Sequence, residues 1–326
     1  MLYRYYIEHM TATAMDLQQL RYFQVVARLE HMRQAADELA ITQPALSRAI
    51  ARLEKELGVP LFNRVGRQLQ LNQFGRVYLE CVERIFNELE AGQRQINDLA
   101  GSETGQVGLA VLHTIGAQLL PELISVYRQQ HPNVSFRLFQ NGSRTMLSQV
   151  ARSDIDLCIT SHLPSQQGVG WIELMNEEIF LAVPSGHRLA NRSHIRLREV
   201  AKEAFVSLKS GYSLREQTDQ LCRQVGFDPK VAFEGDELTV VRGLVAKGLG
   251  VGLIPALAWR CIDDLVPVKL RIIEPQCQRM IGVAWQEDHY LSAAARQFRQ
   301  FLIDYFPQLE REVAFDRDED EPSDGA

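Results

Sequence analysis

Cysteine is scarce in this sequence, and the few cysteines are not arranged for a shared task. Five occur among 326 residues, and no two of them form a Cys-x-x-Cys pair. This pattern speaks against a structural zinc site and a disulfide framework, so we expect no metal and no cofactor. Reduced thiols are typical of the cytoplasm, where we place the protein. The five are Cys81, Cys158, Cys222, Cys261 and Cys277.

Long apolar runs are missing too. No stretch approaches the roughly 20 apolar residues that a membrane-spanning helix needs, and residues 1–15 lack the apolar segment of a signal peptide. We therefore expect no membrane association. We take residues 1–15 as an extension of unknown role, because the patterned sequence begins at Asp16.

The motifs of phosphate-binding and catalytic sites are also lacking. The glycines between Gly248 and Gly252 fit neither G-x-G-x-x-G nor G-x-x-x-x-G-K-[ST] after a strand, and they indicate close backbone packing instead. The sequence offers no nucleophile–base pair and no cluster of metal ligands. An enzymatic function is therefore disfavoured.

Positive charge is in deficit over the whole chain, but one N-terminal segment carries an excess of it. The net charge is −6, of which −5 belongs to the tail from Asp316 to Ala326. The segment from Asp16 to Asn72 instead carries eight Lys or Arg against six acids, a net +2. Because charges act over a Debye length of about 8 Å, this local excess is compatible with DNA binding.

What the sequence does contain is a pattern typical of a helix-turn-helix. Apolar residues at helical spacing predict helices over 17–28, 32–39 and 43–57. Thr42 is a good N-cap and Pro44 fits the first turn of the third helix. The exposed start of that helix would present Gln43, Ser47 and Arg48 to base edges. A basic turn between two short strands after it indicates a wing.

Residues 35–75 resemble the winged helix-turn-helix of LysR-type transcriptional regulators. The runs Gln43–Arg48 (QPALSR) and Leu57–Phe62 (LGVPLF) carry the resemblance, while His31-Met32-Arg33 departs from it. For Arg52 alone, an ordinary solvated helix face stays an equal alternative. The predicted DNA-binding residues are Arg33, Thr42, Gln43, Pro44, Ser47, Arg48, Arg52, Arg64 and Arg67.

A long helix follows the wing. Apolar residues recur from Tyr78 to Leu99 at alternating spacings of 4 and 3, which predicts a seam that needs a partner helix. Dimerisation is favoured, and the resemblance implies the same, as a homodimer or homotetramer. The alternative is a helix packed on its own domain. The predicted dimerisation residues are Tyr78, Val82, Ile85, Leu89, Ile96 and Leu99.

From Gly105 the pattern changes to alternating strands and helices, which predicts an α/β domain with parallel strands. Two chain crossings would divide it into lobe I (105–180 and 283–308) and lobe II (181–282). This region resembles the effector domain of LysR-type regulators, especially the subgroup that includes activators of glutamate synthase, and is similar to type 2 periplasmic binding proteins. The predicted order is an extension (1–15), the DNA-binding domain (16–73), the linker helix and hinge (74–104), the effector domain (105–308) and an acidic disordered tail (309–326).

Hydroxyl-bearing residues follow several predicted strands of this domain. Donors at helix N-termini suit a carboxylate, so we expect an organic anion between the lobes, although each residue taken alone is more often a simple N-cap. The predicted effector-binding residues are Thr114, Ser143, Thr160, Ser161, Ser210, Ser213 and Glu237. Oxidant sensing by Cys158, Cys222 or Cys277, as in one branch of the family, is disfavoured by their apolar surroundings.

Together these patterns predict a transcriptional regulator. Its partners would be double-stranded promoter DNA, a second copy of itself, a small-molecule effector and RNA polymerase. A transport-type binding protein is the other alternative, and the missing signal peptide and the predicted DNA-binding domain oppose it.

Overall fold

The computed structural model describes the backbone of residues 16–65, 68–100, 105–117, 119–161, 164–260 and 266–319, and the side chains of these residues except 64, 65, 68 and 312–319. Residues 1–15, the predicted hinge at 101–104 and the last residues of the tail lie outside this part. Two compact units are found, residues 1–92 and 93–326. Among the described helices, none combines the length and apolar character of a membrane span.

The first unit is built on the three predicted helices, α2 (Leu17–Leu29), α3 (Met32–Glu38) and α4 (Gln43–Leu57). Asp16 and Gln19 form a capping box at the start of α2, and Gly58 ends α4 in the left-handed conformation. Phe23, Leu46 and their apolar neighbours are buried together between the helices. The amphipathic pattern therefore gives the expected helix-turn-helix.

A two-stranded wing follows, formed by β1 (Phe62–Val65) and β2 (Gln68–Leu71) as an antiparallel pair. The carboxylate of Glu54 on α4 accepts hydrogen bonds from the N–H groups of Leu61 (2.7 Å) and Phe62 (3.3 Å). Since Leu61 is also buried in the core of the unit, the wing is fixed to the helix that precedes it.

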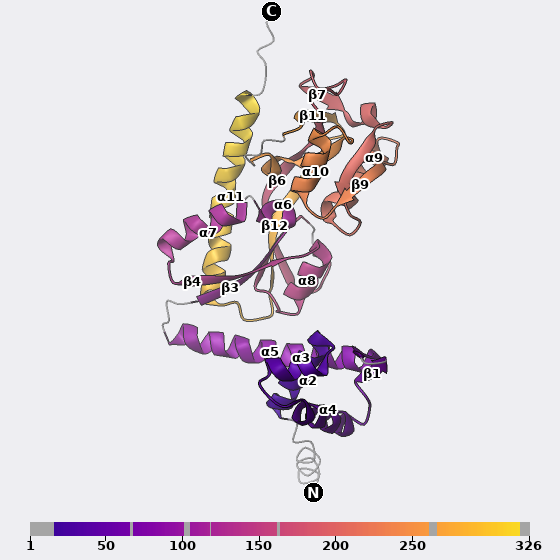
Figure 1. The fold of residues 1–326 in the computed structure, drawn as a ribbon. Coiled ribbons are helices and arrows are strands. Elements are labelled where there is room, and N and C mark those ends of the chain that lie inside the picture. Colours follow the sequence, from indigo (N-terminus) through magenta and orange to yellow (C-terminus); the bar gives the residue numbers. More distant parts are fainter. Residues whose placement is uncertain are drawn as a thin grey trace, which may run out of the picture. The chain divides into compact units, whose positions relative to one another are not determined.

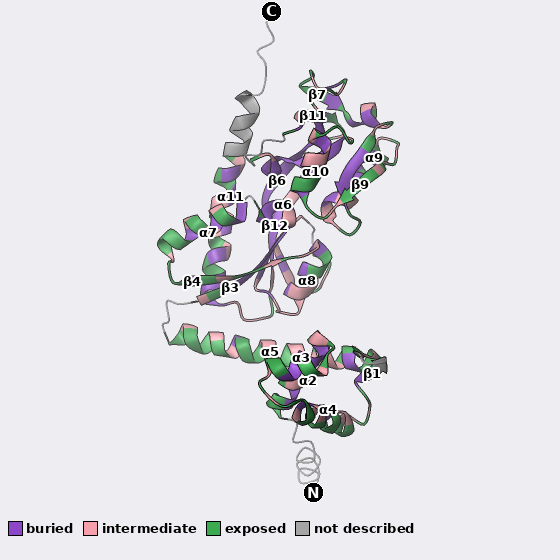
Figure 2. Cartoon of the chain, viewed as in Figure 1, coloured by how far each residue is buried: buried purple, intermediate pink, exposed green. Residues whose placement is uncertain are grey.

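Helix α5 (Gln73–Leu99) is the predicted linker helix, and much of it is exposed (Figure 2). In the first turns of α5, two residues of the predicted seam pack inside the first unit and do not form part of an exposed face. Val82 is fully buried in the core of the first unit, and Tyr78 packs against Phe23 with ring centroids 5.3 Å apart. These two residues are therefore corrected from partner-facing positions to the core of their own domain, because their side of α5 meets α2.

The second unit contains a sheet whose strands run in the order β4-β3-β5-β12-β6-β11-β7, with β10 paired to β6. In lobe I the parallel strands β3 (Gly105–Val111), β4 (Val134–Gln140) and β5 (Leu157–Thr160) lie side by side. The chain passes from β3 to β4 through α6 (His113–Gly116) and α7 (Leu119–Gln130). It passes from β4 to β5 through α8 (Ser143–Ala151). One apolar core fills this lobe.

Two antiparallel strands, β6 (Val169–Val183) and β12 (Gln278–Gln286), run between the lobes (Figure 1). The predicted boundary between lobe I and lobe II at residues 180 and 181 thus lies within the long strand β6. Lobe II adds β7 (His194–Arg196), β10 (Gly252–Pro255) and β11 (Val268–Glu274), the parallel pair β8 (Ala204–Leu208) and β9 (Lys230–Gly235), and helices α9 (Ser213–Gln224) and α10 (Leu238–Ala246). Short 3₁₀ helices η1 (Leu197–Val200) and η2 (Ala256–Arg260) complete it, around a second core.

The final helix, α11 (Ala293–Glu319), is longer than predicted. The sequence predicts that the effector domain ends at 308 and that a disordered tail begins at 309, but the helix continues through Pro307 to Glu319. Leu309 is 1% exposed and belongs to the lobe I core. The apolar face of α11 thus continues past the proline to Leu309 and packs there against the lobe I core.

Candidate functional site

The exposed face of α4 carries most of the predicted DNA-binding residues. Gln43, Pro44, Arg48 and Arg52 are exposed and Ser47 is half-buried, while Leu46, Ile50 and Leu53 face the core. The N–H of Ala45 donates to the hydroxyl of Thr42 at 3.4 Å, which caps the helix. The cap and the buried row together point the first turn of α4 outward, with amide, hydroxyl and guanidinium groups suited to base edges and phosphates.

Two neighbouring segments flank this face. Arg33 is exposed on α3, whose N-cap is His31, with Nδ1 accepting from the N–H of Gln34 at 3.3 Å. The departure from the family pattern at His31 is therefore a helix cap. Arg64 lies in β1 of the wing; its side chain and the whole of Arg67 lie outside the described residues.

Apolar side chains form an exposed row along α5. Ile85 is 37%, Leu89 50%, Ile96 60% and Leu99 83% exposed. Val77, which the sequence analysis did not include, is 67% exposed. Large apolar side chains that recur on one exposed helix face indicate a surface for a partner, so these residues remain dimerisation candidates, with Val77 in the place of Tyr78.

In lobe I, three of the predicted hydroxyl groups lie just beyond or at the ends of neighbouring parallel strands. Thr114 follows β3, Ser143 follows β4 and Thr160 ends β5. The three residues are 6%, 3% and 0% exposed. None of their hydroxyl oxygens has a hydrogen-bond partner among the described residues. A buried polar group without a partner is costly, by about 1–3 kcal/mol, so this cluster needs a physical explanation.

Lobe II faces the same edge of the sheet. The hydroxyl of Ser161, next to Thr160, donates to that of Ser213 at the start of α9, at 3.1 Å. A Cβ atom on Gly142 would lie 3.3 Å from the carbonyl oxygen of Gly211, so the chain before α8 approaches the turn before α9. The N-termini of α8 and α9 therefore approach each other across the lobe interface.

Further contacts join the lobes around this edge. The rings of His113 and Tyr212 have centroids 5.6 Å apart, and Arg144 forms a 3.0 Å ion pair with Glu216. His113 Nδ1 lies 3.9 Å from Glu237 Oε1, beyond hydrogen-bonding distance. The lobe interface is thus packed on several sides of the hydroxyl cluster.

None of Thr114, Ser143 and Ser213 is the N-cap residue of its helix. The N-caps of α6, α8 and α9 are Leu112, Gly142 and Tyr212, and none of them makes a side-chain capping bond. Thr114 instead occupies the second helical position of α6, and Ser143 and Ser213 occupy the first positions of α8 and α9. The two other predicted residues are less central, because Ser210 is exposed in the turn before α9 and Glu237 is exposed at the rim.

Three buried charged residues near the interface were missed by the sequence analysis. Arg242 on α10 is 2% exposed, although its position in the apolar row of Leu238, Val241 and Val245 was a readable signal. Glu177 on β6 and Arg279 on β12 are also buried, and Arg279 Nε donates to Glu177 Oε2 at 2.7 Å. No local pattern would have predicted that pair, because its partners lie on strands far apart in the sequence.

The buried pair fixes the place where the chain crosses between lobes. Glu177 Oε1 also accepts a hydrogen bond from the N–H of Leu257 in η2, at 2.7 Å. The side chain of Leu257 belongs to the lobe I core, although η2 follows β10 of lobe II. Breaking one side of such a pair usually costs about 3–5 kcal/mol, so it rigidly links the crossing strands to η2.

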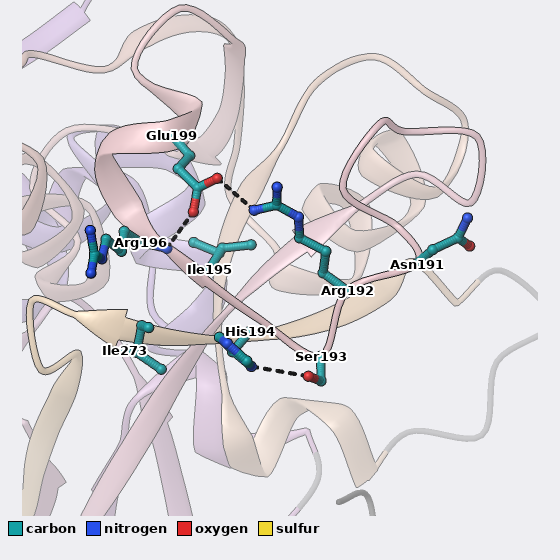
Figure 3. Close-up of a pocket in the computed structure, with 8 residues that line it drawn as sticks. All are labelled: Asn191, Arg192, Ser193, His194, Ile195, Arg196, Glu199 and Ile273. Atoms are coloured by element: carbon teal, nitrogen blue, oxygen red, sulfur yellow. Dashed lines mark hydrogen bonds and ion pairs between the residues drawn. The ribbon is translucent and has the colours of Figure 1, made fainter. Parts of the chain in front are cut away.

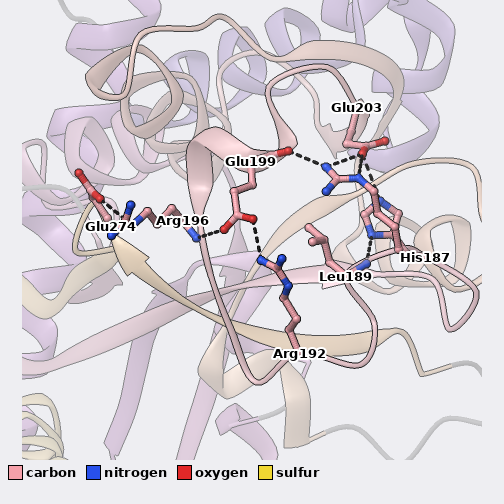
Figure 4. A network of polar contacts seen from close by, with 8 residues as sticks. His187, Leu189, Arg192, Arg196, Glu199, Glu203 and Glu274 are labelled. Carbon is pink, nitrogen blue, oxygen red and sulfur yellow. Dashed lines mark hydrogen bonds and ion pairs between the residues drawn. The ribbon is translucent and has the colours of Figure 1, made fainter.

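A wider hollow, of about 590 Å³, lies on lobe II and is lined by residues 191–196, Glu199 and Ile273 (Figure 3). Most of its charged and polar side chains bind protein partners. Glu199 binds the N–H of Arg196 (2.9 Å) and the guanidinium of Arg192 (2.7 Å), and these contacts belong to the wider ion-pair network of Figure 4. The N–H of Arg196 and the charge of Arg192 hold the pKa of Glu199 below its usual value. This hollow therefore lacks the unsatisfied groups of the lobe interface.

Three of the four described cysteines lack the features of redox sensors. Cys158, Cys222 and Cys277 are buried. Burial raises the pKa of Cys158 well above its usual value, and raises the pKa of Cys222 and of Cys277 to about 12. Thiolates are the reactive form, so these three thiols are poor nucleophiles at neutral pH. Cys261 lies outside the described residues.

Comparisons with known proteins find a family match for each of the two units. Residues 17–76 match the family described as "bacterial regulatory helix-turn-helix protein, lysR family", and residues 100–307 match the LysR substrate binding domain. The chain is 43% identical to YybE of Bacillus subtilis (strain 168), an uncharacterized HTH-type transcriptional regulator, over 90% of this chain and 100% of that protein. It is 35% identical to the transcriptional dual regulator GltC of the same organism, over 91% and 99%.

A solved structure shows the same fold. The crystal structure of full-length CbnR complexed with its target DNA aligns with a TM-score of 0.71 and 20% identity, over 90% of this chain and 100% of that chain. The two family matches cover the DNA-binding unit and most of the effector unit, and the relatives match along nearly their whole length. The chain therefore belongs to the LysR family of DNA-binding transcriptional regulators, which carry an effector domain and are not enzymes.

Proposed function

We propose that this regulator controls a promoter in response to a small organic anion bound between the two lobes of its effector domain. The observation that carries the proposal is the cluster of Thr114, Ser143 and Thr160, buried hydroxyls without a hydrogen-bond partner among the described residues. A carboxylate offers several acceptor lone pairs. One bound at this edge would accept from hydroxyls in lobe I and could be shared with Ser213 in lobe II.

Electrostatics favours the same class of ligand. The N-termini of α8 and α9, each a partial positive charge of about half a unit, meet at the interface without side-chain caps. Two like partial charges repel each other unless an anion lies between them. An anion bound here would favour the closed arrangement of the lobes over an open one, and a ligand shifts a conformational equilibrium by its difference in affinity for the two states.

For the DNA-bound form, α4 is the element proposed to enter the major groove. Gln43, Ser47 and Arg48 are exposed on its first turns, and a helix N-terminus directed at bases is the usual docking mode of this motif. The exposed apolar row of α5 supports assembly into a dimer or tetramer, and two reading heads would then bind a partly palindromic site. A contact with RNA polymerase belongs to the same proposal, as does a cytoplasmic location.

The proposal is tested on the full-length protein with the DNA upstream of its own gene. Small organic anions are screened for those that raise the melting temperature, and each of these is then added to a footprinting titration. We expect at least one to change the affinity or the length of the footprint, with no chemical turnover of the compound during incubation. If every stabilising compound leaves the footprint unchanged, the effector proposal is wrong.

A further inference from the structure

Helix α5 contains a glycine at the point where the two units of the chain divide. The units are residues 1–92 and 93–326, so Gly92 is the last residue of the first unit, although the helix continues to Leu99. A Cβ atom on Gly92 would meet no atom within 4 Å outside its own helix. Packing within the described part of the chain therefore does not require a glycine here.

Glycine makes this part of α5 a weak point. It loses more conformational freedom on folding than any other residue, and it destabilises a helix relative to alanine. Most residues around Gly92 are half-buried or exposed, so few tertiary contacts compensate for the loss. Helices that bend sharply often do so at glycine.

The last turns of α5, beyond Gly92, are fixed to lobe I. Asp98 Oδ2 accepts hydrogen bonds from the hydroxyl of Tyr290 and from the N–H of Ala293, the second at 2.7 Å. Ala293 is the first residue of α11, and the free N–H groups at a helix N-terminus stabilise a carboxylate. Asp98 thus attaches the end of α5 to the start of α11.

Arg94 provides a second link to lobe I. It precedes Asp98 by four residues, which places the two on the same face of the helix. Burial raises the pKa of Asp156 in lobe I, whereas the N–H of Gly108, which donates to it at 2.6 Å, and the charge of Arg94 lower it. The positive charge of Arg94 therefore attracts a carboxylate of lobe I.

The chain after α5 returns to the place where Asp98 is bound. A Cβ atom on Gly105, the first residue of β3, would lie 2.5 Å from Cβ of Ala294, in the first turn of α11. Asp98 and Gly105 are thus both held at the start of α11, on either side of the predicted hinge at 101–104. That segment cannot serve as a pivot between α5 and lobe I while both contacts are kept.

We propose that the pivot between the DNA-binding unit and the effector unit is Gly92, inside α5, and not the segment 101–104. The last turns of α5 then move with lobe I as one body, and a displacement of lobe I reaches the DNA-binding unit through a bend of the helix at Gly92. The position of the pivot is independent of any ligand, whereas its use in regulation rests on the proposed function.

Hydrogen–deuterium exchange of the full-length protein without ligand, followed by mass spectrometry, locates the pivot. Helix ends ordinarily fray, so exchange rises toward the last residue. We expect the reverse in α5. The amides of residues 92–96, whose helical hydrogen bonds span Gly92, should exchange faster than those of residues 97–99. Gly92→Ala should slow exchange at 92–96 about two- to fivefold, because alanine stabilises the helix.

Variants of Asp98 test the attachment to lobe I. Asp98→Ala should accelerate exchange at 97–99, and Asp98→Asn, which keeps an acceptor oxygen, should restore part of the protection. Should Asp98→Ala fail to fold, Tyr290→Phe removes only one of the two hydrogen bonds and should give a smaller acceleration in the same residues. Unchanged exchange at 97–99 in the folded variants would overturn the inference.

Gly243→Ala is the matched control, because Gly243 also lies inside a helix, α10, where a Cβ atom would meet no atom within 4 Å outside that helix. It should slow exchange in α10 and leave α5 unchanged. Light scattering tests whether Gly92 instead allows a second copy to approach closely, and we expect the wild-type mass for Gly92→Ala. A lower mass overturns the inference, as does wild-type exchange that rises steadily from 92 to 99.

The outcomes separate this inference from the proposed function. With an anion that alters the wild-type footprint, Gly92→Ala should bind that anion with unchanged affinity and show a smaller change of the footprint. A full response of Gly92→Ala would overturn the role of Gly92 in regulation. If no anion alters the footprint, the proposed function fails, whereas the exchange data still decide where the pivot lies.

Discussion

Replacing Thr160 by valine should make the unliganded protein more stable while impairing its response to the effector. The hydroxyl of Thr160 lies at the end of β5, in a residue with 0% exposure, and has no hydrogen-bond partner among the described residues. Valine keeps the branched shape and removes only the unpaired polar atom. A residue that served the fold alone would not be expected to behave in this way.

The expected size of both effects follows from the burial of the Thr160 hydroxyl. A buried unsatisfied hydroxyl costs about 1–3 kcal/mol, so the valine variant should gain up to this amount in free energy of unfolding. For a unit of this size about 1 kcal/mol corresponds to roughly 2–4 °C in melting temperature, which gives an increase of roughly 2–12 °C. A bound anion would lose one hydrogen bond of about 1.5–3 kcal/mol, or roughly ten- to hundredfold in affinity.

Melting curves of wild type and variant, with and without a stabilising acid, measure both effects. Thr218→Val is the matched control, because Thr218 is also buried but its hydroxyl donates to the carbonyl oxygen of Leu214 at 2.8 Å. The control should lower the melting temperature and leave the effect of the acid intact. If Thr160→Val also melts below the wild type, its hydroxyl is bonded in the unliganded protein, and the reasoning from unsatisfied groups fails.

Three other predictions concern the exposed face of α4, the exposed apolar row of α5 and the buried cysteines. Arg48→Ala should weaken binding to the specific site by about 1–3 kcal/mol if Arg48 contacts a guanine, whereas Arg223→Ala should not; equal affinities of the Arg48 variant and the wild type in gel-shift titrations would show only a solvated charge. Asp at both Ile85 and Leu89 should dissociate the assembly in light scattering, because two carboxylates would be buried unpaired, while Arg84→Asp on an exposed part of α5 should not; an unchanged mass of the double variant would refute the role of the exposed row. Since the pKa values of Cys222 and Cys277 are raised to about 12 and that of Cys158 is raised as well, peptide mapping after thiol alkylation at neutral pH should find these three unmodified until the protein is unfolded, and modification of the folded protein would contradict their burial.

The fold of the DNA-binding unit could be predicted from the sequence because the residues that determine it lie close together in the chain. Thr42 as N-cap, Pro44 in the first turn and the row of Leu46, Ile50 and Leu53 lie within a dozen consecutive residues, and helical periodicity alone decides which side faces outward. The same periodicity was insufficient in α5. The spacing from Tyr78 to Leu99 defines a face but not its neighbour, so only the fold shows that Tyr78 and Val82 meet α2.

The effector site, too, could be predicted from the sequence only in part. The sequence by itself determined that hydroxyl-bearing residues follow strands, since alternating strand and helix patterns are visible along the chain. Only the tertiary structure brought the ends of β3, β4 and β5 together and set α9 and α10 opposite them, because sheet order and chain crossings depend on packing between distant segments. For this reason the sequence named Thr114, Ser143 and Thr160, whereas the Glu177–Arg279 pair became visible only when its burial was known.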